Sequence, residues 1–322
     1  EMILRDWSSD VCSSDLAMIR QKANEMGYLP NMAARALKTK MTHNIGVLFI
    51  DDYHSGLTHP YFAPVLESLK TEVENLGYDI TFINKNVGGR EMSYLEHCRY
   101  RNVDGVVIAN VDFTKEEVVE LVESDIPVVT IDHVFNNCPA VVSDNIKGIR
   151  ELTEYVISMG HKKIAYIHGQ QNSVTKVRLA SFYRTMEEHE LSVPDEYVPE
   201  APYLEAEASA DVTKKLLALK NPPTCILYPD DYTAIGGIAV IREAGLSIPS
   251  DISVAGYDGI SLIQQFPPKL TTYAQDMSGI GKAAAQAIVD QIERPKSALV
   301  ELIVKAGAVM PGASVRRLNE NK

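Results

Sequence analysis

Residues 143–169 read SDNIKGIRELTEYVISMGHKKIAYIHG. The segment 145–160 has the pattern of a helix, and Gly160 stands where a helix commonly ends. The run KIAYIH at 163–168 is mostly apolar, as in a strand that is covered on both faces. A helix that leads at once into such a strand is typical of a parallel α/β sheet.

The same alternation extends in both directions along the chain. Further strands are predicted at 45–50 (IGVLFI), 79–83 (DITFI), 105–109 (GVVIA), 127–131 (PVVTI), 224–228 (TCILY) and 252–257 (ISVAGY). Helical patterns lie between them, and the halves that begin near residues 45 and 163 open in the same way. We therefore expect an α/β protein with two doubly wound parallel-sheet subdomains. A ligand cleft is expected between them, at the carboxyl ends of the strands.

The bulk composition is that of a globular protein with more than one domain. The chain has 322 residues, a net charge of -12 and 45% hydrophobic residues. No apolar run is long enough to cross a bilayer and no secretory signal is visible, so the cytoplasm is the expected compartment. The four cysteines form no CxxC pair, and neither a metal site nor a cofactor is expected.

The charge is unevenly distributed. Residues 17–44 carry five Lys or Arg residues against one Glu, although the chain as a whole is acidic. A basic segment on an acidic body is typical of a small nucleic-acid contact attached to a sensor, although a solvated basic helix has the same composition. Residues 1–16 (EMILRDWSSDVCSSDL) match nothing that follows. We interpret them as a non-native or disordered segment and leave them out of the fold prediction.

Several segments together resemble the LacI/GalR family of bacterial transcription regulators. They are AMIRQKANEMGYLPNMAARALKT at 17–39, the stretch at 143–169, LYPDDYTAIGGIAVIREAGLSIPSDISVAGYDG at 227–259 and PPKLTTYAQD at 267–276. The resemblance implies a periplasmic-binding-protein-like body of type I, whose two subdomains are joined by crossover strands. A partial helical headpiece and a hinge helix precede this body.

The resemblance also implies domain boundaries and partners. The domains are a headpiece remnant with hinge helix at 17–43, an N-terminal effector subdomain at 44–143 plus 276–303, and a C-terminal effector subdomain at 144–275 plus 304–318. Such a protein is a homodimeric repressor whose binding to operator DNA responds to a small-molecule effector. The same body fold serves periplasmic-type sugar-binding proteins, which is the alternative function.

The basic segment is the expected DNA contact. Residues 17–28 are predicted to form a helix, and Asn31 to cap a second, shorter helix. By resemblance the second helix enters the minor groove, where Leu37 is wedged between base steps; packing against the body is the alternative for this leucine. Arg35 and Lys38 are candidate phosphate contacts. No helix-turn-helix is recognisable in residues 1–16, so the full-length parent is expected to bind the operator and the chain as given is not.

Candidate effector ligands follow the predicted strands, where polar side chains and an aromatic face can meet a neutral sugar. By resemblance His59-Pro60-Tyr61-Phe62 corresponds to the family's Asn-Pro-aromatic-aromatic turn, and Arg178 to a ligand-gripping arginine. The set is His59, Tyr61, Phe62, Asn110, Asp112, Arg178, Asp230, Asp258 and Gln275. Tyr203 lies near a further family aromatic, but the local match slips by one residue. The three aspartates predict an acidic cleft, which favours a neutral or amino sugar, with a purine as the weaker alternative.

Enzymatic activity is not expected. The sequence lacks the motifs GxSxG, GxxxxGK[ST], GxGxxG and HExxH. The adjacent pairs Asp51-Asp52 and Asp230-Asp231 are carboxylates that point to different sides of a strand end, so neither pair is an acid–base couple. His161 is interpreted as a residue between a helix end and a strand start.

Overall fold

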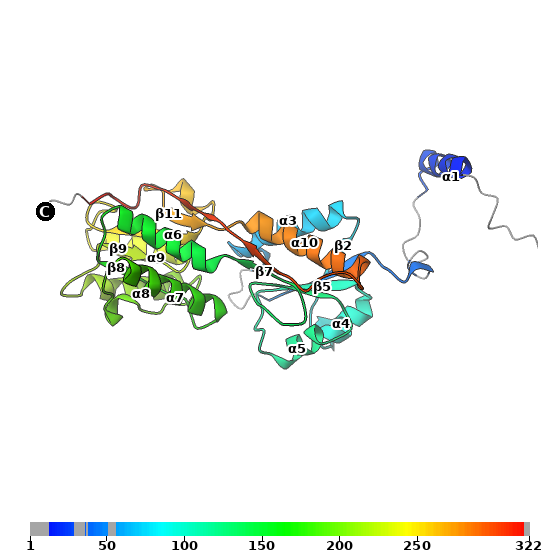
Figure 1. The fold of residues 1–322 in the computed structure, drawn as a ribbon, viewed down its shortest axis with the longest axis horizontal. Coiled ribbons are helices and arrows are strands. Elements are labelled where there is room, and N and C mark those ends of the chain that lie inside the picture. Colours follow the sequence, from blue (N-terminus) through cyan, green and yellow to red (C-terminus); the bar gives the residue numbers. More distant parts are fainter. Residues whose placement is uncertain (1–12, 29–35, 37, 51–55, 319–322) are drawn as a thin grey trace, which may run out of the picture.

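The computed structural model describes residues 13–28, 36, 38–50 and 56–318, whose main strands form two sheets. The first sheet has the strand order β12-β7-β6-β5-β1-β2, and all its pairs are parallel. The second has the order β13-β11-β10-β9-β8, in which the edge strand β13 is antiparallel to β11. Each sheet forms one of the two lobes of the body (Figure 1). The predicted α/β class with two parallel sheets is confirmed, with one antiparallel edge strand added.

The strand bounds agree closely with the sequence patterns. The first sheet contains β1 (Asn44–Phe49), β2 (Asp79–Phe82), β5 (Gly105–Ala109), β6 (Val128–Ile131), β7 (Ala140–Ser143) and β12 (Leu302–Lys305). The second contains β8 (Ile164–Tyr166), β9 (Cys225–Leu227), β10 (Ser253–Asp258), β11 (Thr271–Ala274) and β13 (Ala308–Met310). A separate hairpin pairs β3 (Asn86–Val87) with β4 (Arg90–Glu91). The strand patterns read from the sequence did not include β7, β11 and β13.

Helices cover both faces of each sheet. In the first lobe, α3 (Phe62–Asn75) and α10 (Met277–Glu293) lie on one face, and α4 (Tyr94–Arg101) and α5 (Glu116–Val122) on the other. In the second lobe, α6 (Asn145–Ser158) and α7 (Ser173–Glu188) lie opposite α8 (Ala206–Leu217) and α9 (Asp231–Glu243). Short 3-10 turns occur at η1 (Gly56–Thr58), η2 (Asp195–Tyr197) and η3 (Ile263–Gln265). Successive side chains of a strand point to opposite faces of the sheet. Val47 therefore belongs to the α3–α10 core, and Leu48 to the α4–α5 core.

The helix pairs approach closely at glycines. A Cβ atom at Gly281 of α10 would lie 2.1 Å from the backbone oxygen of Val65 in α3. A Cβ atom at Gly236 of α9 would lie 1.8 Å from the backbone oxygen of Ala206 in α8. Both helix pairs therefore pack backbone against backbone, which only glycine permits at these two points.

Three crossover segments connect the lobes and lie together. They lead from β7 into α6, from β11 into α10, and from β12 into β13. The backbone N–H of Asp144 donates to the backbone oxygen of Lys305 at 2.8 Å. The division predicted between residues 303 and 304 falls inside β12, which pairs with β7 up to Lys305. The chain therefore leaves the first sheet after Lys305.

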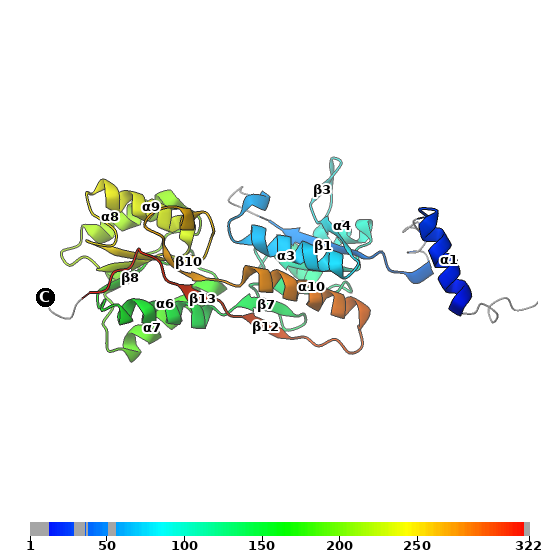
Figure 2. The same cartoon turned by 90° about the horizontal axis from the view of Figure 1, so that it is seen from above.

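Helix α1 (Ser13–Glu25) lies apart from both lobes (Figures 1 and 2). It begins inside the segment 1–16 that was left out of the fold prediction; none of residues 13–16 is a glycine or proline, so a helix can extend through them. The predicted apolar face of this helix is uncovered, with Ile19 62% and Met26 75% exposed. The helix therefore has no packing partner within the described part of the chain.

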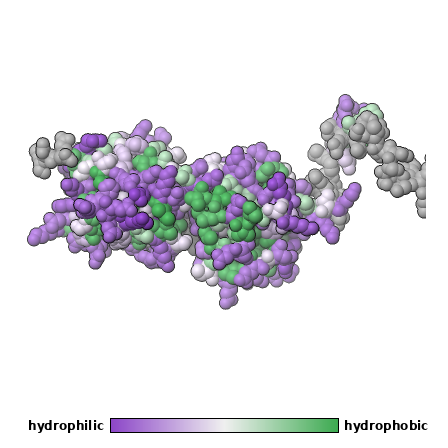
Figure 3. All heavy atoms as spheres, viewed as in Figure 1, coloured by the Kyte–Doolittle hydropathy of each residue, from purple (hydrophilic) through white to green (hydrophobic). Residues whose placement is uncertain are grey.

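Apolar side chains also gather on the surface of the first lobe, near β12 (Figure 3). Leu302 and Val304 of this edge strand are about half exposed. Within the described ranges, no helix has both the length and the apolar character needed to span a membrane.

His161 ties the C-terminal segment to the second lobe. Its side chain is fully buried, with Nδ1 2.9 Å from Thr224 Oγ1 and Nε2 3.1 Å from the backbone oxygen of Arg316. Burial lowers the pKa of His161, against a smaller opposing effect of the Arg316 carbonyl. His161 therefore connects the C-terminal segment to the second lobe, in addition to lying between a helix end and a strand start.

We expect His161→Ala to lower the free energy of unfolding by about 2–4 kcal/mol, because it leaves a cavity and two unpaired polar groups. In the wild-type protein the folded histidine resists protonation, whereas the unfolded one takes up a proton near its ordinary pKa of about 6.5. Stability should therefore fall as the pH drops below about 6.5, and this dependence should weaken in the variant. Urea unfolding between pH 5 and 8 measures both effects, with the exposed His189→Ala as control. Equal unfolding free energies for wild type and His161→Ala would contradict the assignment.

Candidate functional site

A cavity of about 650 Å³ lies between the two lobes, at the carboxyl ends of β1, β5 and β6. Both lobes contribute to its walls. All nine residues predicted from sequence line it: His59, Tyr61, Phe62, Asn110, Asp112, Arg178, Asp230, Asp258 and Gln275. The lining also includes residues that the sequence analysis did not select, namely Phe113, Asp132, His133, Asn145 and the loop 170–174. Residues that are far apart in sequence thus meet in one place.

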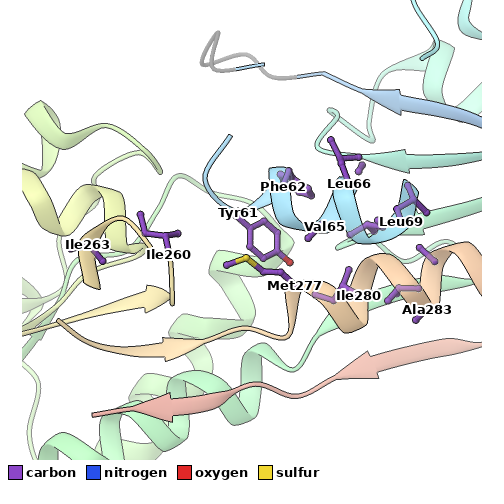
Figure 4. Close-up of a cluster of buried hydrophobic side chains, with 14 of the residues drawn as sticks. Tyr61, Phe62, Val65, Leu66, Leu69, Ile260, Ile263, Met277, Ile280 and Ala283 are labelled. Atoms are coloured by element: carbon purple, nitrogen blue, oxygen red, sulfur yellow. The ribbon is translucent and has the colours of Figure 1, made fainter. Parts of the chain in front are cut away.

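The turn before α3 supplies the aromatic side of the cavity. The Nδ1 atom of His59 accepts hydrogen bonds from the backbone N–H groups of Tyr61 and Phe62, each at 3.2 Å. His59 therefore caps the helix, a role that a carbonyl-bearing asparagine can also fill. The ring of Phe62 packs edge-on against His59, with 5.0 Å between the centroids. Tyr61 lies beside Met277, at the start of α10 (Figure 4).

Asp132 connects this turn to the central strands. Its Oδ2 atom accepts from the Tyr61 hydroxyl at 3.0 Å, and its Oδ1 atom accepts from the backbone N–H of Ser143 at 3.3 Å. The backbone φ of Asp132 is +59°, in the left-handed region. Asp132 follows the predicted strand 127–131 directly. The rule that selected Asn110 and Asp112 after strand 105–109 would have found it too.

Arg178 of α7 is held in place from three directions. Its Nε atom donates to Asn145 Oδ1 at 2.7 Å, and its Nη1 atom donates to the backbone oxygen of Pro229 at 3.0 Å. The guanidinium carbon lies 3.7 Å from the ring centroid of Tyr257. The residue is 4% exposed. It is therefore a fixed charge at the cavity wall and not a surface ion pair.

The two adjacent carboxylates at the start of α9 accept hydrogen bonds from different segments of the chain. Asp230 caps the helix: Oδ1 accepts from Thr233 N at 2.7 Å, and Oδ2 accepts from Leu204 N at 3.1 Å. Asp231 instead accepts from the backbone N–H groups of Gly259 and Ile260, each at 2.8 Å. This divergence confirms that the pair is not an acid–base couple. Asp231 holds the turn that follows Asp258.

Asp258 stands at the end of β10 with a φ of +110°. Its Oδ1 atom accepts from Gln275 Nε2 at 2.6 Å. This bond connects the end of β10 to the segment that leads from β11 into α10. Burial raises the pKa of Asp258 well above its ordinary value, although Arg178 opposes the shift. Burial also raises the pKa of Asp230.

The three aspartates of the expected acidic cleft differ in their exposure to solvent. Asp112 is exposed, and hydrogen bonds from Thr114 lower its pKa, so it is ionised. Burial raises the pKa of both buried aspartates, because it penalises the charged form, and hydrogen bonds from Thr233 and Leu204 oppose this shift at Asp230. This burial could not be read from the sequence.

Tyr203 lies in the cavity wall, although the sequence match near it slipped by one residue. Its hydroxyl is 2.9 Å from Thr175 Oγ1, and its backbone N–H donates to Gln170 Oε1 at 2.9 Å. These bonds join the loop before α8 to the start of α7.

Comparisons with known proteins identify the family. A model of the periplasmic binding protein-like domain matches residues 153–315. The HTH-type transcriptional repressor PurR of Histophilus somni is 30% identical over 279 residues, which cover 85% of this chain and 82% of that repressor. The chain belongs to the LacI/GalR family of transcriptional regulators.

Solved structures of LacI/GalR regulators share the fold. The regulator from Enterococcus faecium with bound ribose has a TM-score of 0.73 at 24% identity, covering 86% of this chain and 100% of that chain. The lac repressor dimer bound to operator and the anti-inducer ONPF has a TM-score of 0.72 at 22% identity, covering 90% and 99%. The resemblance found in the sequence is confirmed. Like its repressor relatives, this LacI/GalR member is a regulator of transcription and not an enzyme.

The candidate DNA contacts stay predictions. Asn31, Arg35 and Leu37 lie outside the described residues. Lys38 is described and is exposed, as a phosphate contact requires.

Proposed function

We propose that this LacI/GalR chain is the sensing and dimer-forming part of a sugar-responsive repressor. A neutral sugar in the cavity between the lobes controls the binding of operator DNA by the full-length protein in the cytoplasm. The observation that carries the proposal is the lining of the cavity, which combines fixed polar groups with aromatic rings. The repressor names of the relatives favour this function over that of a periplasmic-type sugar-binding protein.

The polar groups suit the hydroxyls of a sugar. Arg178 is prepositioned by Asn145, so it can bind a hydroxyl pair at little cost in side-chain entropy. Asp258 and Gln275, which are hydrogen-bonded to each other, offer a further acceptor and donor in the cavity lining. Because both lobes contribute groups, a bound sugar favours one relative arrangement of the lobes over others.

A neutral ligand fits the charges better than an anion does. Arg178 is the one Lys or Arg side chain among the described residues that line the cavity. Asp112 is an ionised carboxylate in the same lining, and an anionic phosphate or carboxylate would approach it. A purine is the second candidate, because the repressor PurR of Histophilus somni is 30% identical to this chain, whereas the ribose-bound regulator of Enterococcus faecium is 24% identical.

The effector class can be tested by thermal unfolding and calorimetry with ribose, glucose, galactose, cellobiose, adenine, guanine and hypoxanthine. We expect at least one neutral sugar to stabilise the protein by about 2.7 kcal/mol at a concentration of 100 Kd. For lobes of this size the midpoint of unfolding should then rise by several degrees. Binding of a purine with no response to any sugar would replace the proposal by the second candidate.

We also propose a homodimer that is formed through α3 and β2. A second hollow of about 500 Å³ is lined by Leu57, Leu66, Ile80 and Phe82, with charged residues at its rim. Leu66 points away from α10 (Figure 4). Phe82 is 39% and Leu57 60% exposed. An apolar surface with a charged rim is the composition of a subunit interface.

The segment 17–43 is proposed as the hinge and headpiece remnant that contacts DNA. Because α1 is exposed on all described sides, its order depends on partners outside the body. Its basic charge supports phosphate contacts, and these position a protein without reading sequence.

A further inference from the structure

The first lobe contributes two separate groups of aromatic side chains to the cavity lining. Tyr61 and Phe62 belong to the core between the first sheet and helices α3 and α10. Phe113 packs against the core on the other face of that sheet, under α4 and α5. His133 stacks on Phe113 and also lines the cavity. Because the sheet itself separates its two faces, the groups stand on either side of the strand ends and not next to each other.

The second group, Phe113 with His133, forms what we call the aromatic wall. The two rings are parallel within 6°, with 4.3 Å between their centroids. Phe135 packs edge-on against both, at 6.1 Å from Phe113 and 4.7 Å from His133. The backbone oxygen of His133 also accepts from Thr130 Oγ1 at 2.6 Å. The wall is therefore braced, and both of its rings are partly exposed to the cavity.

The polar groups around the first aromatic group are sufficient for one sugar ring. Tyr61, Arg178 and Asp258 all line the cavity, and the Tyr61 hydroxyl donates to Asp132 at 3.0 Å. The aromatic wall has its own polar surroundings, with Asp112 beside Phe113 and the loop 170–174 also in the cavity lining. A volume of about 650 Å³ is in the range that holds a ligand larger than a single small ring.

We infer that the effector is a neutral sugar of at least two rings, such as a disaccharide. Its first ring lies between Tyr61 and the pair Arg178–Asp258. Its second ring packs its C–H face on the aromatic wall, where the ring faces carry partial negative charge. This inference rests on the proposed sugar-sensing function and adds the length of the ligand.

The test compares disaccharides with their component monosaccharides by isothermal titration calorimetry. The probes are cellobiose, maltose, lactose, sucrose and trehalose against glucose, galactose and fructose. We expect one disaccharide to bind at least about 10-fold more tightly than either of its components. Phe113→Leu keeps an apolar side chain and removes the ring; it should weaken that disaccharide about 10-fold and change monosaccharide binding less than about 3-fold.

Controls separate this inference from the wider proposal. Phe266→Leu removes an exposed ring outside the cavity and should leave both affinities unchanged. His133→Ala provides a second disruption of the wall if Phe113→Leu proves unstable in thermal unfolding. Monosaccharides that bind as tightly as disaccharides, or wall variants that weaken both equally, would overturn the two-ring inference and leave sugar sensing intact. If neither monosaccharides nor disaccharides bind, both the two-ring inference and the proposed sugar-sensing function are wrong.

Discussion

Arg178→Ala is expected to weaken binding of the effector sugar by about 10- to 150-fold. The guanidinium is buried and already oriented by Asn145, Pro229 and Tyr257, so its hydrogen bonds to the ligand cost little reorganisation. A hydrogen bond to a charged group contributes about 1.5–3 kcal/mol, and alanine also leaves sugar hydroxyls without partners in a closed site. Calorimetry with the tightest sugar of the panel measures the loss.

Arg178→Lys is the matched control for this effect. Lysine keeps the positive charge but has no planar fork, so it cannot hold Asn145 and a ligand hydroxyl together. We expect an intermediate loss for lysine and retained secondary structure, by circular dichroism, for both variants. An affinity within about 3-fold of wild type for Arg178→Ala would remove this residue from the binding site.

Phe82→Glu is expected to convert the proposed homodimer into monomers at micromolar concentration. Phe82 lies on the outer side of the edge strand β2 and is 39% exposed, so glutamate there should not disturb the core of the lobe. In a two-fold interface each subunit contributes the same patch, so a single substitution places two buried charges in the contact. Each unpaired buried charge costs several kcal/mol.

Sedimentation velocity at several protein concentrations tests this expectation. Tyr100→Glu serves as the control, because Tyr100 is an equally large, 61% exposed aromatic on α4, which covers the sheet face opposite α3. The control should sediment like wild type. A Phe82→Glu variant that remains dimeric would place the subunit contact elsewhere on the molecule.

The sequence determined the layered α/β fold through local patterns. The strand at 105–109 is five consecutive apolar residues, and it forms β5 with all five buried. A run of this kind can be stable only when helices cover both faces, so the fold class follows from it. The sequence patterns did not include β7 and β13, which pair with β12 and β11 in the structure.

The sequence also determined which loops carry the polar site residues, because loops at the carboxyl ends of parallel strands meet at one edge of a sheet. All nine predicted residues therefore line a single cavity. Asp132 and His133 satisfy the same rule after strand 127–131 and were not selected. The sequence therefore contains the information needed to predict these two residues as well.

Only the tertiary structure decided how these residues behave. Asp230 and Asp258 look like two ordinary carboxylates in the sequence, but burial raises the pKa of both. Phe113 and His133 are twenty residues apart and become one stacked wall because β5 and β6 are neighbours in the sheet. Burial and stacking depend on which surfaces meet across the fold, and that is a property of the packed chain and not of any local run of residues.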